Sequence, residues 1–405
     1  MARAIPRASS SGSRPRSDGS RPTAGPRSPA PCCRSDAVES PRAARQSCAG
    51  ATAQRHSGRY AFAPVAGVIA ADHRGYMTHW RPPVRFGLGG VALGNGFAPL
   101  TEAQAHDALH AAWDAGIRYY DTSPFYGFGL SERRYGHFLH TQKRSEYTLS
   151  TKVGRIFTAG APRPHPLWKD PSPFVYRYDY TADGVKRALE DSLQRLGIER
   201  IDIVFVHDLS PDNDDELGGW KQQFAIAASG AFPALTKLRE EGVIAAWGLG
   251  VNRIEPIQEV LRVADPDICL LATQYSLSNH ERALHELFPQ LEQHGVSIVV
   301  GAPFEAGFLS GKDRYDYGSS IPDDKARQRA RMAALASEHG VDLRTAALQF
   351  AAAPNVVAAV IPGGRSPEQI RANARSMTEI VPAAFWEALK REALIAADAP
   401  VPVSV

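Results

Sequence analysis

From Arg85 onward, short runs of apolar residues alternate with longer stretches in which apolar side chains recur every three or four positions. The short runs predict eight β-strands at residues 86–93, 119–121, 148–152, 201–207, 245–251, 268–271, 297–301 and 357–361. The longer stretches predict helices at residues 102–115, 131–139, 182–196, 232–241, 255–263, 281–294, 324–339 with 343–352, and 367–376. Strands that alternate with helices in this way are typical of parallel βαβ units.

Eight such units in about 300 residues fit a single (β/α)₈ TIM barrel. The pattern alone leaves a doubly wound open sheet as an alternative. That fold carries a G-x-G-x-x-G motif after its first strand, and the first predicted strand here lacks the motif. We therefore expect an α/β protein with one TIM barrel, assigned to residues 77–405.

Two long segments interrupt the alternation after the third and fourth predicted strands. Residues 157–180 combine five prolines with aromatic residues, and residues 209–232 combine acidic with aromatic residues. Loops that follow barrel strands lie over the C-terminal mouth, where active sites are built. We expect long loops that form a substrate lid, the alternative being loops that merely cover the rim. The aromatic residues expected in the substrate pocket are Phe125, Phe128, Trp168 and Trp220.

Residues 1–76 form an arginine-, proline- and serine-rich leader with few large apolar side chains. Such a segment buries too little surface to offset its ordering entropy, so we expect disorder. It is a solvated tail, a transit peptide, or the product of a mis-assigned start with Met77 as the true first residue. The last explanation is favoured because the barrel pattern begins shortly after Met77. A secretory signal is disfavoured, since no apolar core of roughly 7–15 residues follows the basic start.

Composition and charge narrow the function classes. The 405 residues are 43% hydrophobic and 22% charged, as in globular proteins. Residues 1–76 hold twelve arginines, no lysine and four acids, so the remaining residues carry −5 of the overall charge of +3. That part shows no basic stripe with interleaved aromatic residues, so no nucleic-acid partner is expected. No apolar run reaches eighteen residues, so no membrane span is expected.

The cysteines lie mostly in the leader. Cys32, Cys33 and Cys48 are found there, and Cys269 alone lies in the predicted barrel. This distribution excludes a disulfide framework or a cysteine-rich zinc site in the barrel, and we predict no metal site. It fits a reducing compartment, so we expect a cytoplasmic protein.

Four polar residues lie at or just after the ends of consecutive predicted strands. Asp121 ends the second strand with Tyr126 just beyond it, Lys152 ends the third, and His207 ends the fourth. A lysine at such a buried position requires a paired carboxylate, and Asp121 on the neighbouring strand is the expected partner. Reduction of a carbonyl needs a proton donor at its oxygen, and oxidation of an alcohol needs the reverse.

These residues predict a proton-transfer site. A nearby ammonium lowers the pKa of a tyrosine from its ordinary value of about 10. We therefore expect Tyr126 to be the general acid/base and Lys152 to lower its pKa. Asp121 would hold Lys152, and His207 would orient the substrate oxygen.

These motifs resemble the aldo-keto reductases. The likeness runs from about Phe86 to Met377 and rests on Gly89-Gly90, the spacing from Asp121 to Tyr126, and residues 127–132, 151–154, 202–207 and 361–364. The resemblance implies a TIM barrel that binds a nicotinamide cofactor. It also implies that the matching aspartate, tyrosine, lysine and histidine form a catalytic tetrad, in agreement with the interpretation above.

Segments 191–197, 207–209, 248–252 and 301–309 are similar to the sugar-oxidising branch of that family. The resemblance implies oxidation of a cyclic hemiacetal (lactol) of an aldose such as L-fucose or a D-threo-aldose to its lactone, or oxidation of pyridoxal, mostly with NAD. One alternative is a broad-specificity NADP-dependent aldehyde or ketone reductase acting on small carbonyl compounds. Another is a non-catalytic barrel that binds nucleotide as a regulatory subunit.

The resemblance also places the cofactor. Many members stack the nicotinamide on an aromatic residue where this chain has Gly301, and Phe304 or a lid aromatic could substitute. NADP users often carry cations where this chain has Gly363 and Gln369, so NAD is favoured, with NADP possible. Glu368 would accept from the ribose hydroxyl. The full set of expected cofactor-binding residues is Gly89, Gly90, Asn252, Gln274, Phe304, Pro362, Gly363, Gly364, Arg365, Glu368, Gln369 and Asn373.

Overall fold

The computed structural model describes residues 80–402, so the predictions for the leader at residues 1–76 lie outside the described part. Eight parallel strands form one sheet. In spatial order they are β1 (Leu88–Gly89), β2 (Tyr119–Asp121), β3 (Thr148–Val153), β6 (Ile203–His207), β7 (Ala246–Val251), β8 (Ile268–Ala272), β9 (Ser297–Gly301) and β10 (Val357–Ile361). Seven of the eight begin and end within two residues of the predicted strands.

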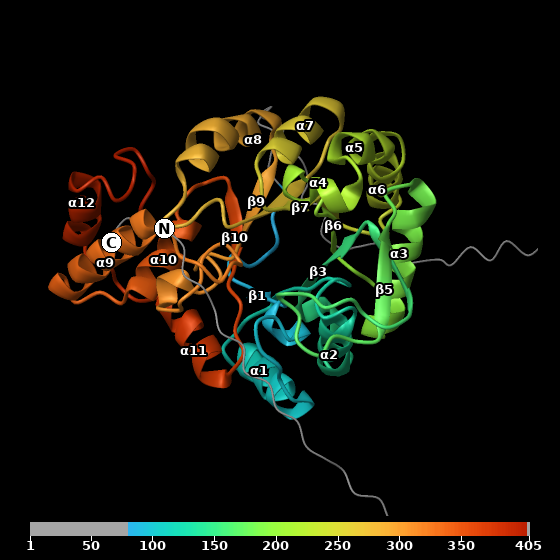
Figure 1. Ribbon diagram of the computed structural model, residues 1–405, viewed down its shortest axis with the longest axis horizontal. Helices are drawn as coiled ribbons and strands as arrows, with labels where there is room; N and C mark the ends of the chain where they lie inside the picture. Colours follow the sequence, from blue (N-terminus) through green and yellow to red (C-terminus); the bar gives the residue numbers. More distant parts are fainter. Residues whose placement is uncertain (1–79, 403–405) are drawn as a thin grey trace, which may run out of the picture. The chain divides into compact units, whose positions relative to one another are not determined.

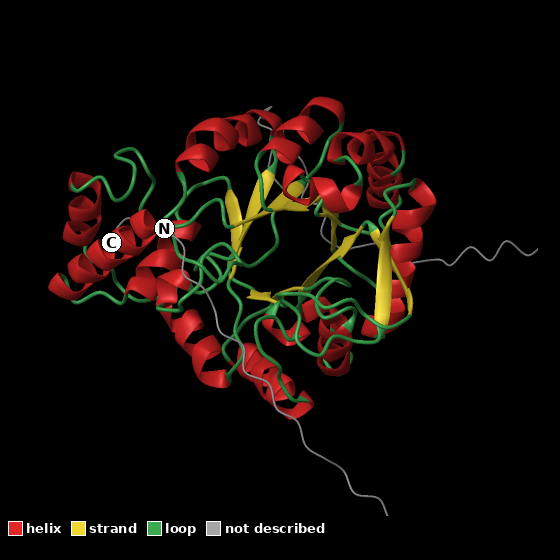
Figure 2. Ribbon diagram, viewed as in Figure 1, coloured by secondary structure: helices red, strands yellow, loops and turns green. Residues whose placement is uncertain are grey.

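The sheet closes on itself, which confirms the barrel and excludes the open sheet. Parallel bridges join Phe86 to Val360 and Gly89 to Gly363. The Gly87 amide donates to the Val360 carbonyl at 3.0 Å, and the Gly89 amide donates to the Pro362 carbonyl at 3.0 Å. Figure 2 shows the strands as a ring with helices outside it.

Helices cover the outside of the ring (Figure 1). They are α1 (Glu102–Asp114), α2 (Leu130–Leu139), α3 (Ala182–Leu196), α6 (Ala231–Glu240), α7 (Glu255–Val263), α8 (Phe288–His294), α9 (Asp323–Glu338), α10 (Leu343–Ala352) and α11 (Pro367–Ser376). Local chemistry sets their ends: the Thr181 hydroxyl accepts from the Gly184 amide at 3.0 Å at the start of α3. Gly197, with φ of +64°, ends that helix, a conformation that glycine adopts without strain.

Two hydrophobic clusters fill the barrel. The strand side chains on one face, including Tyr119, Phe205 and Ile361, form a cluster inside the ring. Those on the other face, including Leu149, Val204 and Leu249, pack with the helices. Because both faces are buried, the strands carry continuous apolar runs rather than an alternating pattern. These runs are the reason that the strands could be predicted from the sequence.

The two long segments are more ordered than the loops we predicted. In the first, β4 (Arg155–Ala159) and β5 (Phe174–Tyr178) pair as an antiparallel hairpin. The second contains α4 (Asp214–Leu217) and α5 (Trp220–Ser229). The prolines between the two strands obscured the hairpin in the pattern. The sequence also missed α12 (Ala383–Arg391), and it extended the first strand past Gly89, where the chain instead turns into a 3₁₀ segment at Ala92–Gly94.

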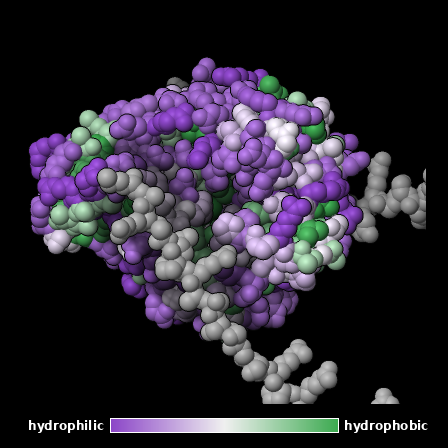
Figure 3. Space-filling model, viewed as in Figure 1, coloured by the Kyte–Doolittle hydropathy of each residue, from purple (hydrophilic) through white to green (hydrophobic). Residues whose placement is uncertain are grey.

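Within residues 80–402, no helix is both long enough and apolar enough to cross a membrane. On the face drawn in Figure 3, hydrophilic residues cover most of the coloured surface, and hydrophobic residues show as separate spots. The apolar residues are thus largely used in the core.

Candidate active site

The carboxyl ends of three adjacent strands bring the predicted polar residues together. Asp121 ends β2, Lys152 lies near the end of β3, and His207 ends β6, and these strands are hydrogen-bonded neighbours in the order β2-β3-β6. Tyr126 follows in the turn after β2, where its carbonyl accepts from the Ser131 amide at 3.1 Å. Parallel pairing therefore places all four residues at one end of the barrel, as the sequence predicted.

Lys152 and Asp121 form a buried ion pair. The Lys152 ammonium donates to Asp121 Oδ2 at 2.8 Å and to the Thr122 carbonyl at 2.8 Å. The Ser150 hydroxyl donates to Asp121 Oδ1 at 2.7 Å. Both charged residues are 1% exposed. The ammonium also lies 4.6 Å from the centre of the Tyr126 ring, so the pair is held directly against that ring.

The electrostatics differ from our expectation for Tyr126. Its pKa is raised well above the usual value, first by burial and then by the Asp121 and Asp208 carboxylates, with the Arg155 guanidinium acting in the opposite direction. Lys152 is compensated by Asp121, which explains why it does not produce the net lowering that we predicted. Tyr126 is thus a phenol that holds its proton at neutral pH. Burial also raises the pKa of Asp121, against the effect of Lys152 and Ser150.

His207 is held in one tautomer by a residue that the sequence did not single out. Its Nδ1 lies 3.1 Å from Arg155 Nη1 and 3.2 Å from the Ser123 hydroxyl. A guanidinium can only donate, so Nδ1 is the acceptor and a neutral ring carries its hydrogen on Nε2. Burial, then Arg155 and Lys152, hold the pKa of His207 well below its usual value. The ring is therefore neutral, with Nε2–H as its donor.

Arg155 itself is fixed by charge and by aromatic rings. It donates to Asp208 Oδ2 at 2.8 Å and to the Tyr178 hydroxyl at 2.9 Å, and its guanidinium lies 4.0 Å from the centre of the Phe125 ring. Arg155 begins β4, three residues after Lys152. In the sequence, the one signal that could have drawn attention to Arg155 was its position just beyond the end of the strand that carries Lys152.

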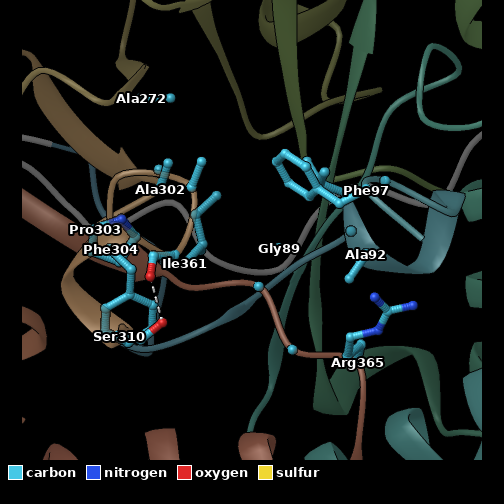
Figure 4. Close-up of a pocket in the computed structure, with 18 of the residues that line it drawn as sticks. Gly89, Ala92, Phe97, Ala272, Ala302, Pro303, Phe304, Ser310, Ile361 and Arg365 are labelled. Carbon is cyan, nitrogen blue, oxygen red and sulfur yellow. Dashed lines mark hydrogen bonds between the residues drawn. The ribbon is translucent and has the colours of Figure 1, made fainter. Parts of the chain in front are cut away.

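A cavity of about 430 Å³ opens beside Asp121 and Tyr126. Figure 4 shows Ala92, Phe97 and Arg365 on one side of it and Ala302, Pro303, Phe304 and Ser310 on the other. The predicted cofactor residues that line this cavity are Gly89, Gly90, Phe304, Gly363, Gly364, Arg365, Gln369 and Asn373. Gly301 also lines it, and the stacked rings of Phe97 and Tyr317 supply further aromatic surface there.

The lining fits a nicotinamide dinucleotide. Four cations line the cavity, namely Lys312, Arg314, Arg344 and Arg365, and Asp121 is the only acidic residue among the described lining residues. Asp121 is already paired with Lys152, so the cavity has a net positive lining that suits the pyrophosphate. Helix α11 begins beside Arg365, and a helix N-terminus also favours phosphate. The sequence had singled out only Arg365 of these four.

Four predicted cofactor residues lie outside this cavity. Glu368 is exposed, and the pKa of its carboxyl is lowered by hydrogen bonds with its own amide and with Ser366, so it turns back onto the start of α11. Gln274 donates to the Thr273 hydroxyl at 3.5 Å. Pro362 is buried, and Asn252 lines a second cavity.

Three of the four predicted substrate-pocket aromatics gather beside Tyr126. The Phe125 ring lies 5.9 Å from Phe128 and 5.5 Å from Trp168, and Trp168 lies 5.6 Å from Tyr126. Trp220 does not join them, because α5 carries it onto Phe224, 6.2 Å away. The sequence pattern had suggested an extended loop here, whereas the chain forms a helix; a place for Trp220 in the substrate pocket stays a prediction.

Fold and site together define an oxidoreductase of the nicotinamide-dependent barrel class. Residues 85–391 match the aldo/keto reductase family, and the chain belongs to that family. It is 37% identical to D-threo-aldose 1-dehydrogenase from a Pseudomonas species, over 76% of this chain and 94% of that protein. It is 38% identical to pyridoxal 4-dehydrogenase from Microbacterium luteolum, with the same coverage.

Solved structures agree with the fold. An aldo-keto reductase from Bacillus halodurans in its holo form superposes with a TM-score of 0.59 at 26% identity, covering 80% of this chain and 97% of that one. An aldo/keto reductase from Klebsiella pneumoniae in complex with NADP and acetate gives 0.54 at 22% identity, covering 79% of this chain and 93% of that one. The second likeness shows the fold alone.

Proposed function

We propose that the protein is an NAD-dependent dehydrogenase that oxidises the lactol of a small aldose, or pyridoxal, to a lactone. The observation that carries the proposal is the Asp121–Lys152 pair held against Tyr126 and opening onto a cation-lined cavity. The two relatives at 37% and 38% identity, named for an aldose and for pyridoxal, support the substrate class.

The tetrad residues have distinct parts in this proposal. A bound oxidised nicotinamide would supply the hydride acceptor. His207 donates Nε2–H to the lactol oxygen and orients it. In oxidation the deprotonated form of Tyr126, which forms as the pH rises, takes the hydroxyl proton at Oη as the C–H bond of the lactol breaks; in reduction the phenol gives that proton back. The Asp121–Lys152 pair keeps that phenol in place. Because the pKa of Tyr126 is raised, oxidation gains rate as the pH rises, and reduction is favoured at lower pH.

The choice of NAD rests on the end of the cavity next to α11. Gly363 and Gln369 line it with neutral atoms. The Arg365 guanidinium beside them donates to the Ala98 and Pro99 carbonyls, whereas a 2′-phosphate would need free cations there. The remaining cations suit the pyrophosphate that NAD and NADP share. The family supports NAD(P) in general, and the preference for NAD is the finer part of the proposal.

The test is an initial-rate screen of the full chain with NAD and with NADP against L-fucose, L-galactose, D-arabinose and pyridoxal. Turnover of a sugar or of pyridoxal with NAD supports the proposal. Consumption of NADPH with simple aldehydes, and no turnover of these four compounds, contradicts it and indicates a general reductase.

A Tyr126→Phe variant tests the proton step separately. It should bind the cofactor as the wild type does, by fluorescence quenching, and lose about 10²–10⁴-fold in kcat. Retained turnover contradicts the role of Tyr126.

A further inference from the structure

A second cavity, of about 290 Å³, is lined by Arg155, the residue that contacts His207. Its polar lining includes Arg155, His165, Asp208, Asn213, Glu216 and Asn252. The rings of Phe125 and Tyr317 form an apolar wall of this second cavity, and Tyr317 lines the cofactor cavity as well. We call it the polar recess. Residues of both long segments, His165 from the first and Asn213 from the second, line it.

The walls of the recess are held by cross-segment hydrogen bonds. The hydroxyls of Tyr178 and Tyr176, on β5, donate to Glu216 Oε2 on α4 at 2.9 and 3.2 Å. Asn252, after β7, donates to Asp212 at 3.4 Å. The hairpin and the α4 segment are thus joined at this recess, which gives it a defined lining rather than a set of independent surface chains.

Hydrogen-bonding capacity remains along this lining. Within residues 80–402, Asn213 uses only its amide nitrogen, which donates to the Asp208 carbonyl at 3.3 Å. His165 uses only Nδ1, which accepts from the Leu167 amide at 3.1 Å. Arg155 Nε is buried and has no partner in the described part of the chain. Asn213 and His165 are half-buried, so these donors and acceptors are accessible to a ligand that supplies both.

We propose that the polar recess binds the hydroxyl groups of the sugar chain beyond the reacting carbon, and that the preferred substrate is therefore an aldose rather than pyridoxal. This inference rests on the proposed function. A hydroxyl donates one hydrogen bond and accepts two, so adjacent hydroxyls match a wall of neighbouring amides, carboxylates and guanidinium groups. Pyridoxal carries fewer hydroxyl groups on its flat ring and would make fewer of these hydrogen bonds, so a site built to bind hydroxyls disfavours it.

Two variants test the recess without touching the tetrad. Asn213→Leu removes the amide at similar volume. His165→Phe keeps the ring against Phe125, at 5.5 Å, and against Trp168, at 6.0 Å, and removes its free nitrogen. The matched control is Gln222→Leu, an exposed position of α5 outside the recess. All are measured as kcat/KM of the full chain with NAD.

For the better aldose, each recess variant should lose about tenfold in kcat/KM, and the Gln222→Leu control should lose nothing. With 2-hydroxytetrahydrofuran, a lactol that carries no hydroxyl beyond the reacting carbon, the variants should match the wild type. Deoxy analogues of the aldose should be poorer substrates of the wild type by about tenfold per missing hydroxyl, and this penalty should shrink in the variants.

The outcomes separate the two proposals. In one outcome, the wild type oxidises aldoses while each recess variant has the wild-type kcat/KM and each deoxy sugar is as good a substrate as its parent aldose. That result overturns the recess inference, and the proposed function stands. A higher kcat/KM for pyridoxal than for every aldose also overturns the recess inference alone. If neither aldoses nor pyridoxal are turned over, both proposals fall.

Discussion

Replacing Lys152 by methionine tests the buried ion pair most directly. The ammonium makes two hydrogen bonds of 2.8 Å, to Asp121 and to the Thr122 carbonyl. Methionine fills a similar volume without charge. Asp121, 1% exposed, keeps only the Ser150 hydroxyl as a side-chain partner in the described structure. The variant therefore isolates the cost of a buried carboxylate that has lost its cation.

The expected cost is large. Breaking a buried pair by removing one partner destabilises a protein by about 3–5 kcal/mol, which corresponds to a fall in Tm of roughly 4–7 °C for a domain of this size. A double variant that also carries Asp121→Asn removes both charges. It should recover most of the loss, since no unpaired charge remains and the asparagine oxygen still accepts from Ser150.

The loss should also depend on pH with a defined sign. Without Lys152, the folded-state pKa of Asp121 rises further above its unfolded value, because burial then acts with less opposition. Below the unfolded pKa the carboxyl is neutral in both states and costs nothing. As the pH rises above that value, the unfolded state ionises first, so the variant loses stability relative to wild type. The deficit should therefore be smaller at pH 5 than at pH 8.

The assay is thermal and urea unfolding of the wild type, both single variants and the double variant at pH 5 and pH 8. Arg187→Met is the control, because its pair with Asp191 is exposed, and it should change Tm little. Equal stability of Lys152→Met and wild type, or a double variant as unstable as the single one, would refute the buried-pair argument.

Three further predictions concern other parts of the barrel. Since the pKa of His207 is lowered well below its usual value, the ring should stay neutral between pH 8 and pH 6. Its titration should therefore add no acid limb to the kcat/KM profile in that range. In Arg155→Met an acid limb should move toward neutral pH, and an unchanged pH profile would contradict the role of Arg155. Gly136→Ala should destabilise by about 1–3 kcal/mol, because a Cβ there would lie 2.2 Å from the Leu196 carbonyl oxygen; a Tm equal to wild type would show that α2 and α3 are not packed this closely. Gln369→Arg should raise the ratio of NADP to NAD turnover by about tenfold or more, and an unchanged ratio would place the 2′-phosphate elsewhere.

The sequence predicted the barrel because its strands are buried on both faces. Continuous apolar runs such as Ile203–His207, separated by helices with marked apolar faces, reveal a parallel sheet without any knowledge of contacts. The same regularity showed that Asp121, Lys152 and His207 follow adjacent strands, so their meeting at one end could be predicted. Only the residues within regular βα units could be placed in this way.

Irregular segments could not be predicted because their partners lie far away in the chain. The hairpin of β4 and β5 is fixed by contacts with Glu216 and Phe125, and the position of Trp220 depends on a helix with a weak pattern. The elevated pKa of Tyr126 follows from burial and from carboxylates on other strands, which no spacing rule shows.

By itself, the sequence determined the barrel, the order of its elements and four residues of the candidate site, since these depend on local periodicity and on the fixed geometry of parallel strands. The tertiary structure alone decided the tautomer of His207, three of the four cations around the cofactor cavity, and the polar recess. These features depend on side chains that are distant in the sequence and that folding brings together. Arg155 and Asn213, for example, lie 58 positions apart in the chain. Hydrogen-bond partners and electric fields act through space, so they appear only once the chain has folded.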